Sequence, residues 1–168
     1  MIVVSVSGGV WRVTAATNAT KFAQINDANG NAIVLEGVLI MPNDSAKYGP
    51  WAGKILTCAE SAGLVYAIDT NGVAMPYNLG ASKPEDLRLI PSGQNLYQAD
   101  AGDRVLRFTA DRFADFAGDI LLVDEVVDQF QCSTGGLWIV HWDGGRFVVR
   151  RLSFPSGLEH AAFAPIGL

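Results

Sequence analysis

The segment that decides the predicted architecture is LEGVLIMP, residues 35–42. It holds a glutamate, five intervening residues and a proline, and this pattern returns at residues 85–91 (EDLRLIP) and 159–165 (EHAAFAP). In each copy the residues two, four and five positions beyond the glutamate are apolar, although the first of them is the small Ala161 in the last copy. A strand that recurs with the same two ends predicts a repeat protein.

A second internal match supports the repeat. Residues 52–60 (AGKILTCAE) parallel residues 117–125 (AGDILLVDE), and each is followed by a strand-like segment, 64–69 (LVYAID) or 137–143 (LWIVHWD). Four-stranded antiparallel units that recur at about 40 to 50 residues are typical of β-propeller blades. We therefore predict an all-β fold, a β-propeller built from four-stranded antiparallel blades.

The composition agrees with short strands and tight turns. The chain has 168 residues, 49% of them hydrophobic and 17% charged, with 18 glycines and seven prolines, which fits one domain over residues 1–168. The Asn71-Gly72 turn between apolar runs is the strongest hairpin signal. We count 14 strand-like segments, which predicts three to four blades per chain.

The spacing and the two ends of the chain bear on closure. The second and third glutamate strands lie 74 residues apart and not 49, so one innermost strand is expected to have lost its glutamate, with residues 104–109 as the candidate. The N-terminal region supplies three strands without an innermost one. We expect the strand at 158–165, of the same or a partner chain, to complete this first blade, and hence a homodimeric ring. The alternatives are a closed four-bladed ring and a fragment of a longer propeller.

Residues 96–108 (LYQADAGDRVLRF) resemble the NHL-type propeller repeat, although Asp103 directly precedes Arg104 where that repeat has one more turn position. Residues 36–165 also look like a group of bacterial six-bladed propeller proteins without an established activity. The resemblance implies that this chain is about half of such a propeller and that longer members often carry export signals. The start at Glu36-Gly37 is similar to that of the gluconolactonase and senescence-marker family, in which such a glutamate binds a divalent cation.

The three repeated glutamates, Glu36, Glu85 and Glu159, are the candidate metal ligands. Because each begins an innermost strand, their side chains could meet in one central channel, and carboxylate oxygens suit Ca²⁺ or Mg²⁺. Without a cation they would repel and raise one another's pKa values. The alternative, which we favour, is that each glutamate caps backbone amides of a neighbouring blade.

A further repeated acidic position follows the second strands, at Glu60, Asp100 and Glu125. Acidic residues before blade turns usually accept backbone hydrogen bonds, so we interpret these three as turn formers before ligands. The two histidines, His141 and His160, read as structural.

Tyr48 and Trp51 are the candidate ligand-binding residues. Both lie in the loop of residues 43–51, closed by Gly-Pro, and we expect Trp51 to be exposed at a rim. Trp138 and Trp142 share a strand face and are expected in the core.

The charged residues and cysteines limit the classes of partner and the covalent links that we expect for this chain. The 12 basic and 17 acidic residues give a net charge of −5, which disfavours nucleic acid. The one basic cluster, residues 146–151 (RFVVRR), places Arg150 and Arg151 on opposite faces and is expected to be solvated. Cys58 reads as a core residue, and a bridge to Cys132 is left open.

No apolar run is long enough to span a membrane. Residues 1–9 read as a strand and not a signal peptide, so we expect a soluble chain. No nucleophile or zinc motif is present. The sequence therefore favours a non-catalytic binding or interaction module, with a protein or small ligand at the channel mouth. The alternative is a divalent-metal-dependent lactonase of the gluconolactonase type.

Overall fold

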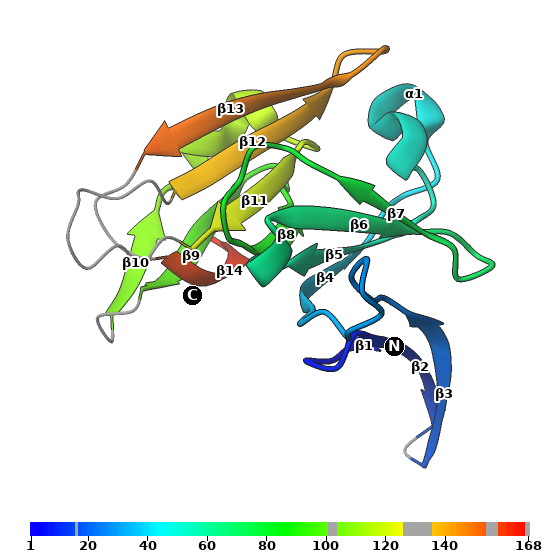
Figure 1. Cartoon of the computed structure of the whole chain (residues 1–168). Helices are drawn as coiled ribbons and strands as arrows, with labels where there is room; N and C mark the ends of the chain where they lie inside the picture. The colour runs from blue at the N-terminus through cyan, green and yellow to red at the C-terminus, as the bar shows by residue number, and fades with distance from the viewer. Residues whose placement is uncertain (16, 101–103, 126–135, 154–157, 167–168) are drawn as a thin grey trace.

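The computed structural model describes residues 1–15, 17–100, 104–125, 136–153 and 158–166, whose strands form four antiparallel sheets (Figure 1). The first sheet has the order β1 (Ile2–Val4), β2 (Gly9–Ala15), β3 (Asn18–Gln24). The second has the order β4 (Glu36–Ile40), β5 (Ile55–Ala59), β6 (Leu64–Ile68), β7 (Ala74–Tyr77). The third has the order β8 (Pro84–Leu89), β11 (Ile120–Asp124), β12 (Gly136–Trp142), β13 (Phe147–Ser153). The fourth has the order β14 (Leu158–Pro165), β9 (Gln94–Asp100), β10 (Arg104–Phe108).

Short helical turns join some of these strands. They are α1 (Ser45–Tyr48), η1 (Gly49–Trp51), η2 (Glu60–Ala62) and η3 (Ala110–Phe116). The prediction of an all-β chain is confirmed, and the described residues contain 14 strands, at the predicted segments. The four sheets do not close into a barrel or ring within the described chain, so the number of blades stays a prediction.

The sheets stack face to face in the order first to fourth, with a separate hydrophobic core between each pair. Strand β11 shows why its sequence is a continuous apolar run. Leu122 faces the core shared with the second sheet, whereas Leu121 and Val123 face the core shared with the fourth. A strand covered on both faces needs apolar residues at every position. The two matching strands, β5 (ILTCA) and β11 (ILLVD), are therefore covered by a neighbouring sheet on both faces.

The three glutamate strands, β4, β8 and β14, form the inner edges of the second, third and fourth sheets (Figure 1). β8 lies between the other two. Gly37 of β4 has φ +52°, and a Cβ there would lie 2.8 Å from the Glu85 carbonyl oxygen of β8. On the other side, the Asp86 carboxylate accepts a hydrogen bond from the Ala161 amide of β14 at 3.0 Å. These contacts fix the spacing of the inner strands.

The hairpin β9–β10 follows β8 in sequence but does not continue its sheet. Instead β8 pairs with β11, and the hairpin pairs with β14. Residues 104–109 are therefore not an innermost strand, because β10 is the outer edge of the fourth sheet, with Val105 69% exposed. The physical reason is burial: residues 120–123 of β11 are apolar and can fill the position between β8 and β12, whereas β10 carries the exposed Arg104 and Arg107.

The C-terminal strand is also placed differently from the expectation. β14 pairs with β9 of its own chain and does not join the first sheet, which has three strands in the described chain. Leu158 and Ala161 are buried in the core between the third and fourth sheets. Pairing with β9 while packing against that core buries more apolar surface of β14 than pairing with the edge of a sheet alone would.

Candidate functional site

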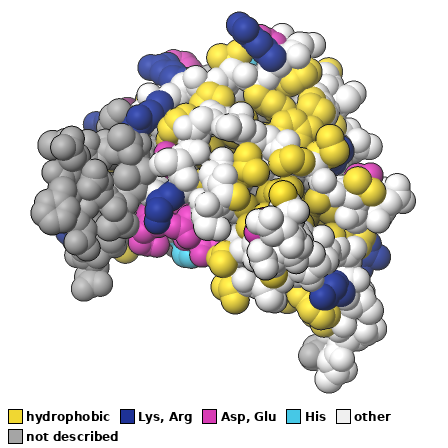
Figure 2. Space-filling view, in the orientation of Figure 1, with side chains coloured by type: hydrophobic (Ala, Val, Ile, Leu, Met, Phe, Trp, Pro, Cys, Tyr) yellow, Lys and Arg dark blue, Asp and Glu magenta, His cyan; other side chains and the backbone are white. Residues whose placement is uncertain are grey.

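All five glutamates of the chain gather where the inner strands begin. One glutamate is the first residue of β4, and two are the second residues of β8 and β14. The other two directly follow β5 and β11. We call this set the glutamate cluster; it consists of Glu36, Glu60, Glu85, Glu125 and Glu159. Figure 2 shows acidic side chains gathered near the starts of β8 and β14, with a histidine at their margin.

Three members of the cluster are close enough to share one ion. Carboxylate oxygens of Glu36, Glu60 and Glu85 all lie within 4.8 Å of one another. The Lys83 ammonium donates to Glu60 Oε1 at 2.7 Å and lies 3.6 Å from Glu125 Oε2. One lysine thus bridges the glutamates that follow two equivalent strands, β5 and β11.

β-bulges set the direction of the inner glutamates. The pairing of β4 with β5 shifts between Glu36 and Val38, and that of β14 with β9 shifts between Leu158 and Ala161. A third shift, between Val123 and Asp124 of β11, lies opposite Glu85 in β8. A bulge leaves a residue unpaired and bends the strand. In β4 that residue is Gly37, next to Glu36, whereas in β8 and β14 the glutamate itself lies within the shift.

A side chain from the neighbouring strand satisfies the bulged carbonyls in two of the sheets. Thr57 Oγ1 contacts the carbonyl oxygens of Glu36 at 3.0 Å and Gly37 at 2.9 Å. Gln98 Nε2 donates to the carbonyl of Glu159 at 2.7 Å and lies 3.2 Å from that of His160. Both Thr57 and Gln98 are fully buried. Hydrogen bonding within the core therefore holds the bulges that aim the glutamates.

Glu85 is the electrostatic centre of the cluster. Its side chain is only 6% exposed. Burial, followed by a hydrogen bond with Glu36 and the charges of Glu36, Glu159 and Glu125, raises the pKa of Glu85 to about 9. At neutral pH its carboxyl group is consequently protonated and donates to Glu36. The hydrogen bond from Lys83 has the opposite effect on Glu60, whose pKa is lowered.

Two buried aspartates beside the cluster serve the backbone. Asp86 accepts from Arg88 at 2.7 Å, from the Leu87 amide at 2.9 Å and from the Ala161 amide. Asp124 accepts from the Lys83 amide at 2.7 Å. Burial raises the pKa of both groups. Because their oxygens hold strand starts in place, they are structural residues and not candidate ligands.

The donor set determines what the cluster can bind. Every group within the 4.8 Å triad is a carboxylate, and hard cations such as Ca²⁺ and Mg²⁺ take oxygen ligands. The nearest imidazole, His160, has its Nε2 3.8 Å from Glu85 Oε1 and is 64% exposed. These residues fit a divalent hard cation.

The structure thus brings Glu36 and Glu85 together, and Glu159 lies near enough for its charge to act on Glu85 and Glu125. The contact expected for Glu36, Glu85 and Glu159, in which a carboxylate accepts from a backbone amide of the neighbouring sheet, is made by Asp86 with the Ala161 amide. Sequence reasoning read Glu60 as a turn former and missed its place in the triad. The signal was present in the sequence, because Glu60 and Glu125 end the two matching segments.

Trp51 has no exposed surface, so the prediction that it lies exposed at a rim was wrong. Its indole ring stacks on Phe147 with ring centroids 4.0 Å apart and meets Tyr77 edge-on at 5.4 Å. Tyr48 is also buried, and burial raises its pKa. The helical turns α1 and η1 fold the loop inward, so both aromatic residues fill the core between the second and third sheets.

The remaining expectations concern single residues. His141 is exposed and its Nδ1 lies 2.8 Å from Asp119 Oδ1, which is a structural contact. Cys58 is a buried free thiol, and burial raises its pKa well above the usual value. Cys132 and the side chain of Asp100 lie outside the described residues.

Comparisons with protein-family models, with curated proteins and with solved structures found no match to this chain. In the described part of the chain, no helix combines the length and apolar character needed to cross a bilayer.

Proposed function

We propose that this chain is a propeller-type binding module and that the glutamate cluster is its ligand site, with a divalent cation as the ligand. The observation that carries the proposal is the convergence of three carboxylates within 4.8 Å around the buried Glu85. Burying a carboxyl group among like charges is costly unless a proton or a cation balances it. A cation would replace the proton of Glu85 and neutralise its neighbours.

Three features support the propeller part of the proposal. Consecutive sheets share cores face to face, their inner strands β4, β8 and β14 lie side by side, and in each of these strands a glutamate lies at or next to a register shift. With four sheets in the chain, we infer three to four blades and a ring that a second copy completes. The resemblance to NHL-type repeats points the same way. A protein or small molecule would then bind at the mouth of the channel, over the cation.

Thermal unfolding with and without cation tests the proposal. Chelator-treated protein should gain stability when Ca²⁺ or Mg²⁺ is added, because a ligand that binds only the native state stabilises it, by about 2.7 kcal/mol at 100 times Kd. For a domain of this size that is a rise in Tm of about 5 to 10 °C. The double variant Glu36→Gln/Glu60→Gln should abolish the rise, whereas Asp115→Asn, on the exposed surface of η3, should keep it. An unchanged Tm for wild-type protein with both cations, confirmed by calorimetric titration, would overturn the proposal.

A metal-dependent lactonase remains the second candidate, and His160 is the observation that favours it. Its exposed imidazole stands beside Glu85 and could accept a proton from water at the edge of the cluster. Hydrolysis of aldonolactones by cation-loaded protein, lost in His160→Gln with cation binding retained, would favour the enzyme. Cation binding without turnover favours the binding module.

A further inference from the structure

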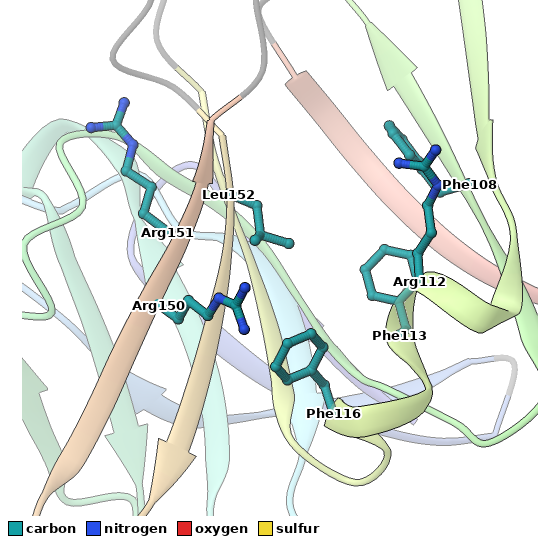
Figure 3. Close-up of a pocket in the computed structure, with 7 residues that line it drawn as sticks. All are labelled: Phe108, Arg112, Phe113, Phe116, Arg150, Arg151 and Leu152. Carbon is teal, nitrogen blue, oxygen red and sulfur yellow. The ribbon is translucent and has the colours of Figure 1, made fainter.

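A pocket lies at the outer strand β13 of the third sheet and shares no residue with the glutamate cluster. It has a volume of about 560 Å³ and opens between η3, the end of β10 and the outer strand β13 (Figure 3). Pockets of roughly 300 to 1,000 Å³ are the size that takes small ligands. Its principal side chains are three phenylalanines and two arginines, which we call the arginine pocket: Phe108, Phe113, Phe116, Arg112 and Arg150.

The two arginines come from different elements and face the same space. Arg150 extends from β13 with its guanidinium 5.2 Å from the centre of the Phe116 ring. Across the pocket, Arg112 of η3 lies beside Phe108, as Figure 3 shows. Arg151, although it borders the pocket, points to the opposite side of β13 and lies over Trp138 at 5.5 Å. This arrangement agrees with the predicted alternation of Arg150 and Arg151.

No carboxylate side chain is among the described residues that line this pocket. Within the described chain, neither Arg112 nor Arg150 has an acidic partner, whereas Arg146 of the neighbouring turn is paired with Asp143 at 3.4 Å. These two guanidinium groups, one of them over the Phe116 ring, create a local positive field in a chain whose net charge is −5. The stacking of Arg150 on Phe116 also orders that guanidinium before any ligand arrives.

We infer that the arginine pocket binds a small organic anion that has a flat apolar body. The body would lie against the phenylalanine rings, with the buried Phe113 as the floor. Its carboxylate or phosphate group would accept hydrogen bonds from Arg112 and Arg150, since a guanidinium matches such groups with paired N–H donors. We expect both halves of the ligand to be needed, because two solvated arginines alone, or the phenylalanine rings alone, would hold a small molecule only weakly.

Calorimetric titration with three probes tests this inference. Phenyl phosphate carries both halves, inorganic phosphate only the anion, and phenol only the ring. We expect phenyl phosphate to bind at least tenfold more tightly than either of the others. Equal affinity for phenyl phosphate and inorganic phosphate would overturn the inference, as would an absence of binding at millimolar concentration.

Single substitutions test whether phenyl phosphate binds in the arginine pocket. Arg150→Gln and Arg112→Gln should each weaken phenyl phosphate binding by tenfold or more, and Phe116→Leu should weaken it without changing the charge. Arg146→Gln is the matched control: it removes the same charge from the adjacent exposed turn and should leave the affinity unchanged. Equal losses in Arg146→Gln and Arg150→Gln would contradict the site. An unchanged Tm confirms that each variant folds, and unchanged Ca²⁺ binding separates this result from that of the glutamate cluster.

Discussion

Glu85 shows how a single residue joins stability to ligand binding. Its carboxyl group is buried, carries a proton at neutral pH and donates that proton in a hydrogen bond to Glu36. The sequence indicated that repeated glutamates would meet and raise one another's pKa values. It could not show which one would be buried, because that depends on β8 lying between β4 and β14.

The pKa of Glu85 predicts how stability changes with pH in chelator-treated protein. Its folded pKa is about 9, against 4.5 for the free group. Between these values the folded state holds a proton that the unfolded state has lost, so stability falls as pH rises from about 4.5 to 9. Glu85→Gln keeps a hydrogen-bond donor and cannot ionise. Its Tm should therefore exceed that of the wild type increasingly above pH 5, by at least about 2 to 4 °C at pH 8, which corresponds to about 1 kcal/mol.

Thermal melts of both proteins from pH 5 to 9 provide the measurement, with Asp115→Asn as the control for loss of an exposed acid. Parallel curves for the wild type and Glu85→Gln would show that Glu85 titrates normally.

The sequence predicts which segments form strands better than it predicts which strands pair with each other. All 14 segments and the three inner strands were predictable, because period-two alternation and Gly or Asn-Gly turns are local signals. The strand that pairs with the hairpin β9–β10 was not predictable. That strand, β14, lies about 60 residues further along the chain, and a pattern of buried residues does not show which strand lies beside it. The matching segments at 52–60 and 117–125 did contain the answer, since they place β11 beside β8 as β5 lies beside β4. Trp51 was mispredicted because Gly-Pro signals a turn but not the direction in which that turn folds.

The close approach of β4 to β8 can be tested at Gly37. Gly37→Ala places a Cβ 2.8 Å from the Glu85 carbonyl oxygen at a positive φ. We expect a loss of about 1 kcal/mol from the left-handed conformation and a further loss of about 1 to 3 kcal/mol from overpacking. Gly93→Ala is the control, because Gly93 has φ +68° and a Cβ added there would meet no heavy atom of the described residues within 4 Å.

Urea unfolding of the two variants measures the difference. Gly37→Ala should unfold at lower urea concentration than Gly93→Ala and should bind Ca²⁺ more weakly. Equal midpoints would mean that the inner strands are not in firm contact.

At the scale of the whole molecule, the stack of sheets is open. The inner strand β4 leaves Ile40 59% exposed, and the first sheet has no described inner strand. Because β14 is used within its own chain, an exchange of that strand is not needed to form a dimer. If a second copy completes the proposed ring, we expect the contact to lie at this open inner edge and to bury Ile40.

Light scattering coupled to size-exclusion chromatography should therefore give about twice the chain mass of 17.9 kDa. Ile40→Arg should shift the protein to the monomer, because a charge would be buried at the contact. Val73→Arg, at an equally exposed position in the β6–β7 turn, should not. A monomeric wild type at every concentration would contradict the dimer.

The insertion of β9–β10 between β8 and β11 has a consequence for cooperativity. The first and second sheets are each continuous in sequence, so each can form from a local stretch of chain. The strands of the third and fourth sheets alternate along the chain. β8 pairs with β11, which follows only after the hairpin β9–β10, and that hairpin pairs with β14, which follows only after β13. Each of these pairings closes a long loop that contains strands of the other sheet, and the two sheets share a hydrophobic core, so we expect this half of the molecule to unfold as a single unit. The arginine pocket lies within that unit, whereas the glutamate cluster spans its border with the second sheet.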